Sequence, residues 1–284
     1  MLTHVYHLHA LTALHVGVGQ AVGAVDLPIM RAKATNLPIV PGSAVKGVTR
    51  DEFAGSANQK TLFGPESILD GDTAHAGALA FGDAHLLILP VRSLAGITAF
   101  ATCPFVLARY ADSLGQAGLS APDVPSVRDQ SALLCAATCL KAKDDIVILE
   151  DLDLHGSDGA DRWADAIGDC VHAGDTSWQV RFKERFAILS DDDFSFLADT
   201  ATEIRARIRI GDRGVVADGA LWYEENLPAE SLLWGSVAAD PARDGRAMDR
   251  TAVMSAFKDG IGSGRMLQIG GKATIGRGLV RFVI

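Results

Sequence analysis

This sequence of 284 residues lacks several features that would assign it to a common class. It has no run of about 20 apolar residues, which a membrane-spanning helix requires. It has only four cysteines and no CxxC pair, so we expect neither structural zinc nor disulfides. Its N-terminal stretch has no basic region and no cleavage site of the kind that marks a signal peptide. We therefore expect a cytoplasmic protein without a membrane partner.

A surplus of positive charge is also missing, since 26 Lys and Arg face 35 Asp and Glu, a net charge of −9. Nucleic-acid-binding proteins are usually basic. The distribution is uneven, however, because acids fill the middle of the chain and basic residues gather near its ends. The terminal basic residues are Arg31, Lys33, Lys46 and Arg50, then Lys258, Arg265, Lys272, Arg277 and Arg281. If these ends meet, they form a phosphate-binding face; a solvated surface of uneven charge is the alternative.

The hydrophobic pattern predicts interleaved strands and helices, which is typical of an α+β fold. Alternating residues predict a first strand around residues 6–13. An apolar stripe predicts a helix from Ser43, whose hydroxyl could cap it. Further predictions are a strand at Ile146–Leu154, helices at Arg162–Ala173 and Asp192–Arg209, and a long β-hairpin at Ile208–Glu225. We expect a single domain over residues 1–284, with a variable insertion at residues 111–180.

Two glycine-rich segments suggest close approach of the backbone to phosphate groups. Gly17, Gly19 and Gly23 miss the dinucleotide-binding spacing by one residue. The second segment, GGKATIGRG, lacks the order of residues in a phosphate loop. Tight turns explain both segments equally well.

Several motifs in a fixed order resemble one protein family. LHVGVGQAVGAVDLPIMR, LPIVPGSAVKGVTR and LQIGGKATIGRG resemble the start and the C-terminal loop of the RAMP superfamily of CRISPR proteins. LFG, GALAFGDAHLLILPVRS, ATCPFVLARY and DGALWYEENLPAESLLWG resemble in particular the backbone subunit of the Cmr (type III-B) effector complex, in the Cas-seven family.

The resemblance implies a ferredoxin-like, RRM-like β-sheet core with large insertions and a β-hairpin thumb at residues 205–230. It implies that copies of the chain stack head to tail along a guide crRNA, together with other Cmr subunits. The thumb would splay base pairs between guide and single-stranded target RNA. Leu221, Trp222 and Tyr223 would be its wedge residues, or else pack within the thumb itself.

The resemblance also implies a set of guide-binding residues. Lys46 and Arg50 are spaced i, i+4 on the predicted helix, so they share one face. That face would lie on the guide backbone, although a solvated face is the alternative. The whole expected RNA-binding set is Arg31, Lys33, Ser43, Lys46, Arg50, Gly270, Gly271, Lys272 and Arg277.

Asp26 matches the loop aspartate on which target cleavage depends in this family. An aspartate there can hold a divalent cation, Mg²⁺, or orient the attacking 2′-hydroxyl. His15, Glu224 and Glu225 are further catalytic candidates. A turn-forming role for Asp26 and a structural role for His15 are the alternatives.

The combined hypothesis is an RNA-guided, metal-dependent endoribonuclease that cuts complementary target RNA at regular intervals. The alternative within the family is a non-catalytic scaffold that only holds guide RNA. A metabolic α+β enzyme is a third hypothesis, but no cofactor motif supports it. The acidic total predicts weak, steeply salt-dependent RNA binding by an isolated subunit.

Overall fold

The computed structural model describes residues 1–19, 25–66, 74–211 and 214–284, so Gly23 of the first glycine-rich segment lies outside it. The α-helices are α1 (Gly42–Glu52), α2 (Gln59–Phe63), α3 (Pro104–Gln116), α4 (Asp161–Val171), α5 (Thr176–Arg185), α6 (Asp191–Thr200) and α7 (Arg250–Ile261). The strands are β1 (Leu2–Ala10), β2 (Ile39–Val40), β3 (Leu79–Phe81), β4 (Ala84–Ser93), β5 (Ile97–Thr102), β6 (Ser131–Leu134), β7 (Ile146–Leu149), β8 (Leu152–Asp158), β9 (Phe186–Leu189), β10 (Glu203–Ile210), β11 (Val216–Asn226), β12 (Leu232–Ala239), β13 (Arg265–Gln268) and β14 (Leu279–Val283). The fold is therefore α+β, as predicted.

Among the described residues, twelve of these strands form one sheet in the order β13-β14-β1-β12-β4-β5-β9-β6-β8-β7, with β2 beside β4 and β3 beside β12. The first strand, β1, lies inside this sheet and pairs antiparallel with both β12 and β14. Residues 5–10 are all buried, so both faces of β1 are covered. The pairing of β1 with β14 brings the two ends of the chain together.

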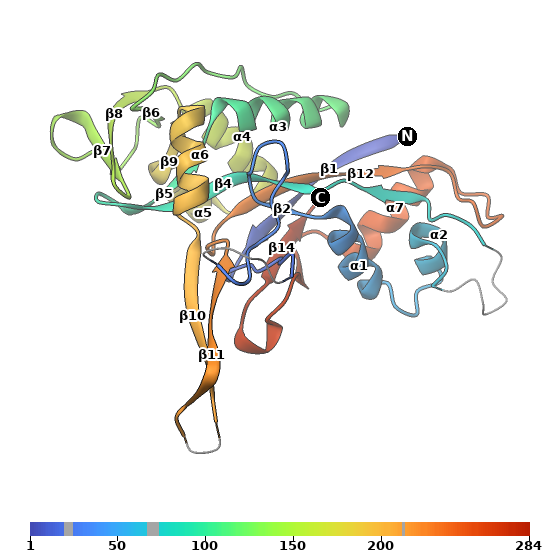
Figure 1. Cartoon of the computed structure of the whole chain (residues 1–284). Coiled ribbons are helices and arrows are strands. Elements are labelled where there is room, and N and C mark those ends of the chain that lie inside the picture. The colour runs from blue at the N-terminus through green and yellow to red at the C-terminus, as the bar shows by residue number, and fades with distance from the viewer. Residues whose placement is uncertain (20–24, 67–73, 212–213) are drawn as a thin grey trace.

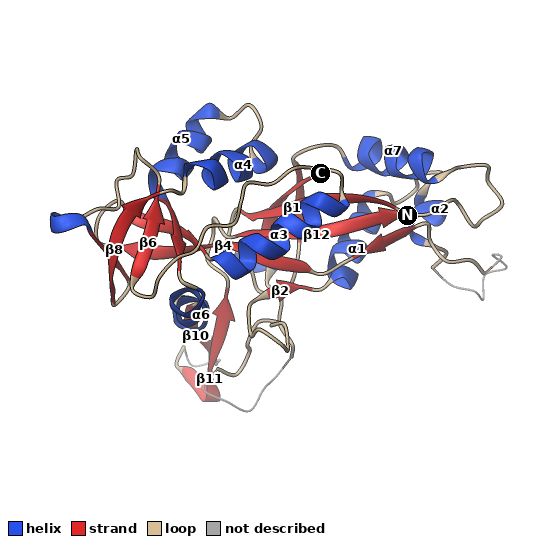
Figure 2. Cartoon of the chain, turned by 90° about the horizontal axis from the view of Figure 1, so that it is seen from above, coloured by secondary structure: helices blue, strands red, loops and turns tan. Residues whose placement is uncertain are grey.

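The far end of the sheet curls back on itself. Ser93 of β4 pairs with Leu149 of β7, and the Leu94 N–H donates to the Ile148 carbonyl at 3.0 Å. This contact closes a ring of strands in the order β4-β5-β9-β6-β8-β7. Figure 2 shows α4 and α5 gathered at this end, with α1, α2 and α7 at the other.

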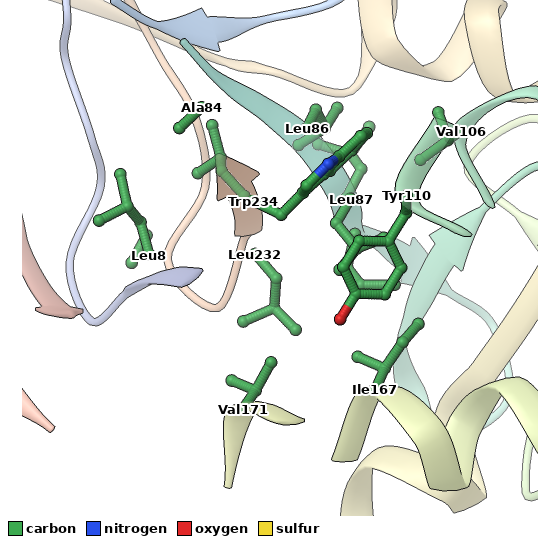
Figure 3. Close-up of a cluster of buried hydrophobic side chains, with 14 of the residues drawn as sticks. Leu8, Ala84, Leu86, Leu87, Val106, Tyr110, Ile167, Val171, Leu232 and Trp234 are labelled. Atoms are coloured by element: carbon green, nitrogen blue, oxygen red, sulfur yellow. The ribbon is translucent and has the colours of Figure 1, made fainter. Parts of the chain in front are cut away.

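Helix α3 packs against the sheet through a cluster of buried aromatic side chains. Its buried residues recur at helical spacing, so one face packs on the sheet. Tyr110 of α3 meets Trp234 of β12 edge to face, with 5.5 Å between ring centroids (Figure 3). The Trp234 indole N–H donates to the Ser113 hydroxyl at 3.1 Å. Burial of each large side chain contributes about 1.5–3 kcal/mol, so this cluster anchors α3 firmly.

Strands β10 and β11 form a separate two-stranded hairpin, which projects from the body of the protein (Figure 1). It leaves the body after α6 and returns into β12. This hairpin, hereafter the thumb, confirms the predicted β-hairpin. No helix in the described residues is both long and apolar enough to cross a membrane.

Several predicted boundaries were wrong. The first strand spans Leu2–Ala10 rather than residues 6–13, and the hairpin begins at Glu203 rather than Ile208. Helix α6 ends at Thr200, and β10 occupies the rest of the predicted helix Asp192–Arg209. The alternation of Ile and Arg in β10 favours a strand, because β-branched residues suit a pleated surface. The predicted strand Ile146–Leu154 is instead two strands, β7 and β8, which turn at Glu150 with φ at 49°.

The predicted cap of α1 was also wrong. Pro41 occupies the N-cap position, and no side chain caps the helix from there. Ser43 lies in the first turn and is exposed. The Asp83 carboxylate, from the loop before β4, accepts the Gly42 N–H at 2.8 Å instead. The Asp83 carboxylate, distant in sequence, thus accepts a backbone N–H of the first turn, a role that the Ser43 hydroxyl was expected to fill.

Candidate functional site

The loop that carries Asp26 runs along the base of the thumb. The Leu27 N–H donates to the Tyr223 carbonyl at 3.1 Å, and the Glu225 N–H donates to the Leu27 carbonyl at 3.0 Å. The Asp26 carboxylate accepts the Tyr223 N–H through Oδ2 at 2.7 Å. Residues 26–29 therefore run beside β11, which they join through an isolated parallel bridge between Leu27 and Glu224. Asp26 itself is exposed, and no hydrogen bond among the described residues engages its Oδ1.

Glu225 is the buried centre of this junction. Its Oε2 accepts the Ile29 N–H at 3.0 Å, and its Oε1 accepts the Arg31 guanidinium at 2.6 Å and the Thr202 hydroxyl at 3.0 Å. A buried carboxylate needs such partners, because an unpaired charge away from water is costly. Glu225 consequently joins the Asp26 loop, the C-terminal end of α6 and the thumb.

His15 contacts the same junction from the other side. Its Nδ1 lies 2.7 Å from the Glu225 carbonyl oxygen, so Nδ1 carries the proton and donates. That leaves Nε2 of the neutral ring as an acceptor, and an ideal Cβ built on Gly17 would lie 2.7 Å from it. His15 is buried at the edge of the glycine-rich turn, where its free nitrogen could accept a proton.

The C-terminal glycine-rich loop packs against His15. The Gly271 N–H donates to the His15 carbonyl at 2.9 Å. Gly270 has φ at +79°, and a Cβ there would lie 2.3 Å from the same carbonyl oxygen. Glycine is needed at this position for both reasons. Gly17 of the first glycine-rich segment and Gly270 and Gly271 of the second therefore all lie against His15.

Glu224 faces away from Glu225 and is surrounded by basic residues. Its Oε1 lies 2.9 Å from the Lys272 Nζ and accepts the Trp222 indole N–H at 2.8 Å. Arg277 and Arg207 lie 3.8 Å and 4.0 Å from Oε2, which has no hydrogen-bond donor among the described residues. Burial alone raises the pKa of the Glu224 carboxyl, but the Lys272 and Trp222 hydrogen bonds and the neighbouring positive charges hold it below its ordinary value. Glu224 is thus an anion that balances a basic cluster.

The thumb has two chemically different faces. Residues directly opposite in the hairpin share a face, and Ile204, Ala206 and Ile208 pair with Glu225, Tyr223 and Leu221. Leu221 and Tyr223 are exposed on this apolar face. Arg205 and Arg207 lie on the other face, opposite Glu224 and Trp222. Of the three expected wedge residues, Trp222 is therefore separated from the other two.

The expected RNA-binding residues have different surroundings. Lys33 is exposed, whereas Arg31 is largely buried in the Glu225 junction. Lys46 and Arg50 occur on α1 as predicted, and Arg50 lies 3.6 Å from Glu66. Partial burial and the nearby Arg50 charge lower the pKa of Lys46. Lys272 and Arg277 flank Glu224 instead, so the structure gives the two basic pairs separate partners.

Sequence reasoning missed the arginines of β10. Arg205 and Arg207 face the Lys272 cluster, and Arg277 also donates to Asn226 on β11. The signal was the alternation RARIRI at residues 205–210, which places the arginines on one face once the segment is recognised as a strand.

The described residues contain no group of three or more His, Cys, Asp and Glu side chains that could hold a metal ion. Mg²⁺, however, is often held by one or two carboxylates together with substrate phosphates. Asp26 offers one carboxylate oxygen of this kind. The donor set therefore fits a cation shared with a phosphate and does not fit a cage built by the protein alone.

Comparison with known proteins identifies the family. Residues 7–281 match the RAMP superfamily. The chain belongs to this superfamily. It is 34% identical over 297 residues to the CRISPR system Cmr endoribonuclease Cmr4 of Pyrococcus furiosus, covering 100% of this chain and 96% of the relative. A shorter stretch, 21% of the chain, is 39% identical to the Cms endoribonuclease Csm3 of Streptococcus thermophilus.

Solved RAMP structures share the fold over the whole chain. The crystal structure of oligomeric Cmr4 from Pyrococcus furiosus has a TM-score of 0.76 at 27% identity, and covers 100% of this chain and 97% of its own. A chain of the type III-B Cmr-beta complex bound to cognate target RNA has a TM-score of 0.74 at 19% identity, over 100% and 97%. At 19% identity, the similarity to the Cmr-beta chain shows a shared fold and no more.

Proposed function

We propose that this RAMP protein is the repeated backbone subunit of a type III-B CRISPR complex and cuts target RNA. The observation that carries the proposal is the convergence of Asp26, His15 and the C-terminal glycine-rich loop at the thumb base. The endoribonuclease relative, which aligns over the whole chain, supports the same activity. Its partners are guide crRNA, target RNA, further copies of the chain and other Cmr subunits.

We propose that the strands β14, β1, β12 and β4 form a ferredoxin-like core. Their order along the sheet is fourth, first, third and second in the chain, and every neighbouring pair is antiparallel. Helix α1 lies between the first two of these strands in the sequence, and α7 between the last two. This order and these helices support a β-α-β-β-α-β arrangement, in which the remaining strands would be insertions.

The cleavage chemistry would centre on Asp26. In cleavage by a 2′-hydroxyl, positioning contributes more than a strong base does. Asp26 could hold a divalent cation against the scissile phosphate, and the cation would stabilise charge there. His15 Nε2, which no hydrogen bond among the described residues engages, could accept the 2′-hydroxyl proton. Glu224 and Glu225 are more fully engaged by protein partners than Asp26 is, so Asp26 rather than either glutamate is proposed to act at the phosphate.

The test is target cleavage by the complex reconstituted with guide RNA, comparing wild type with Asp26→Ala, with and without Mg²⁺. We expect regularly spaced cuts that Asp26→Ala reduces at least about 100-fold while guide binding is retained. Unchanged cuts in the variant would place the chemistry elsewhere. An absence of cuts by the wild type would favour the non-catalytic scaffold.

A further inference from the structure

Arg31 is the basic residue closest in sequence to Asp26, but its side chain points into the protein. Nη1 donates to the Asn36 carbonyl at 2.8 Å and to Asp199 at 3.2 Å. Nη2 donates to the Ala198 carbonyl at 3.1 Å and to Glu225 at 2.6 Å. The four N–H groups of the two terminal nitrogens therefore all have protein acceptors, and only 16% of the side chain is exposed.

These partners belong to three separate parts of the fold. Asn36 lies in the same loop as Asp26, Ala198 and Asp199 end α6, and Glu225 lies at the base of the thumb on β11. A guanidinium can make this set of bonds because its N–H groups are fixed in one plane. Arg31 thus fixes the Asp26 loop to the helix and the strand that frame it.

The link from Arg31 to Asp26 is short. Glu225, which accepts from Arg31, also accepts the Ile29 N–H through its other oxygen. Two residues before Glu225, the Tyr223 N–H donates to the Asp26 carboxylate. Loss of the Arg31–Glu225 pair would release both the loop and the strand that hold Asp26. A displacement of about 1 Å at a reacting group can lower a rate about 100-fold.

We propose that the Arg31–Glu225 pair, hereafter the latch, positions Asp26 for target cleavage and that Arg31 is not an RNA contact. The proposal rests on the proposed function, because it assigns Asp26 the cleavage chemistry. It differs from the expectation raised by the sequence, in which Arg31 binds RNA and Glu225 acts in catalysis. Arg31 and Glu225 are positioning residues here, since neither presents a free group to a substrate.

The test compares Arg31→Ala, Arg31→Lys, Glu225→Gln and Asp26→Ala with wild type in the complex reconstituted with guide and target RNA. Each variant is assayed for target affinity over a series of salt concentrations, for cleavage rate at saturating target, and for thermal unfolding. Lys33→Ala, an exposed cation two residues away, shows how loss of an RNA contact would behave. Arg243→Ala breaks an exposed Arg–Asp pair at 2.8 Å to Asp240 and is the matched control for loss of an ion pair.

We expect Arg31→Ala and Glu225→Gln to lower the rate at saturating target about 10–100-fold, with affinity and its salt dependence unchanged. Arg31→Lys keeps the charge but not the full set of bonds, so it should recover part of the rate. The Arg31→Ala and Glu225→Gln double variant should be no slower than the slower single one, because both remove one latch. Arg243→Ala should cleave like wild type.

Two results would overturn the latch. One is a loss of affinity with a shallower salt dependence, as expected for Lys33→Ala, because it would make Arg31 a phosphate contact. The other is normal cleavage by both latch variants while Asp26→Ala is inactive, which would leave Asp26 catalytic but positioned without the latch. Normal cleavage by Asp26→Ala would instead refute the proposed function. If Arg31→Ala does not fold, Arg31→Lys and Glu225→Gln decide the question.

Discussion

We compare two polar networks with buried centres, which differ in how many of their polar atoms have hydrogen-bond partners. One is the junction around Glu225, Arg31, His15 and Asp26. The other links Glu230 to Arg281 through two histidines, with 3.0 Å between Glu230 Oε2 and His9 Nε2, 3.0 Å between His9 Nδ1 and His172 Nε2, and 3.0 Å between His172 Nδ1 and Arg281 Nη1.

The proton positions in the second network, hereafter the histidine chain, follow from its ends. Arg281 can only donate, so His172 accepts at Nδ1 and carries its proton on Nε2. His172 therefore donates to His9, which in turn donates to Glu230. Each ring nitrogen has a partner, and Trp178 stacks on His172 at 3.9 Å between centroids. The histidine chain joins β1, β14, the end of α4 and the turn after the thumb, and it leaves no ring nitrogen for a substrate.

The junction differs because it leaves atoms unbonded at its edge. Among the described residues no hydrogen bond engages Asp26 Oδ1 or His15 Nε2. Both networks have buried centres and both contain histidine, so neither burial nor residue type separates them. The difference teaches that an uncommitted polar atom on an exposed side chain, such as Asp26 Oδ1, marks a candidate site, whereas the uncommitted Glu224 Oε2 is buried.

The largest effect should come from closing the space beside His15. Gly270→Ala forces a Cβ against the His15 carbonyl at a left-handed φ and should destabilise the protein by roughly 2–5 kcal/mol. Gly276→Ala is the matched control, because Gly276 has φ at +77° but nothing within 4 Å of its Cβ, and it should cost only about 1–2 kcal/mol. Urea unfolding measures both. Equal losses would mean that backbone strain alone matters at Gly270.

Removal of the Glu224 counter-charge should have a smaller effect. Lys272→Ala leaves a buried carboxylate short of a partner, so we expect a loss of about 1–3 kcal/mol and a higher pKa for Glu224. Adding Glu224→Gln should recover part of that loss, because the uncompensated charge is then gone. Urea unfolding of Lys272→Ala, Glu224→Gln and the double variant gives the interaction free energy between the two side chains. Strict additivity would show that the pair does not interact.

Acid should weaken the histidine chain. Burial, together with neighbouring His9 and Arg281, lowers the pKa of His172 in the histidine chain to about 4. Outside the histidine chain, burial lowers the pKa of His7, which contacts the Tyr110 hydroxyl, to about 4. Unfolded histidine titrates near 6.5, so the unfolded chain binds more protons between these values. Stability should therefore be complete above about pH 6.5 and fall as the pH decreases towards 4.

Urea unfolding at a series of pH values between 7.5 and 4.5 measures this slope. His172→Gln should make the slope shallower, because one of the histidines with a lowered pKa is then absent. The test measures the free energy of unfolding and not target cleavage, so its result does not depend on the Asp26 junction. A stability that does not change across this range would show that the histidines are not held neutral by the fold.

Much of the fold could be predicted because its signals are local. The alternation of residues 6–13 predicted β1, and a short apolar stripe predicted α1. The thumb was predicted from alternation around a turn. Where two local patterns overlapped, as at Asp192–Arg209, prediction failed, because helix and strand propensities compete within the same few residues.

The candidate site could be predicted only as a set of residue types. Asp26, His15 and the C-terminal glycines were singled out from motifs, and the structure brings them together at the thumb base. The buried pairing of Arg31 could not be predicted from such motifs. Its partner Glu225 lies 194 residues away, and a cation near a glycine-rich loop resembles a phosphate ligand until its acceptors are known.

The sequence by itself thus determined the periodicity of the elements, the basic ends and the glycine positions that permit close approach. Only the tertiary structure decided which charges are paired inside the protein and which atoms remain available. The physical reason is that propensity acts over a few neighbouring residues, whereas the pairing of buried charges depends on which strands meet. Here the meeting of the Asp26 loop, α6 and β11 decides it.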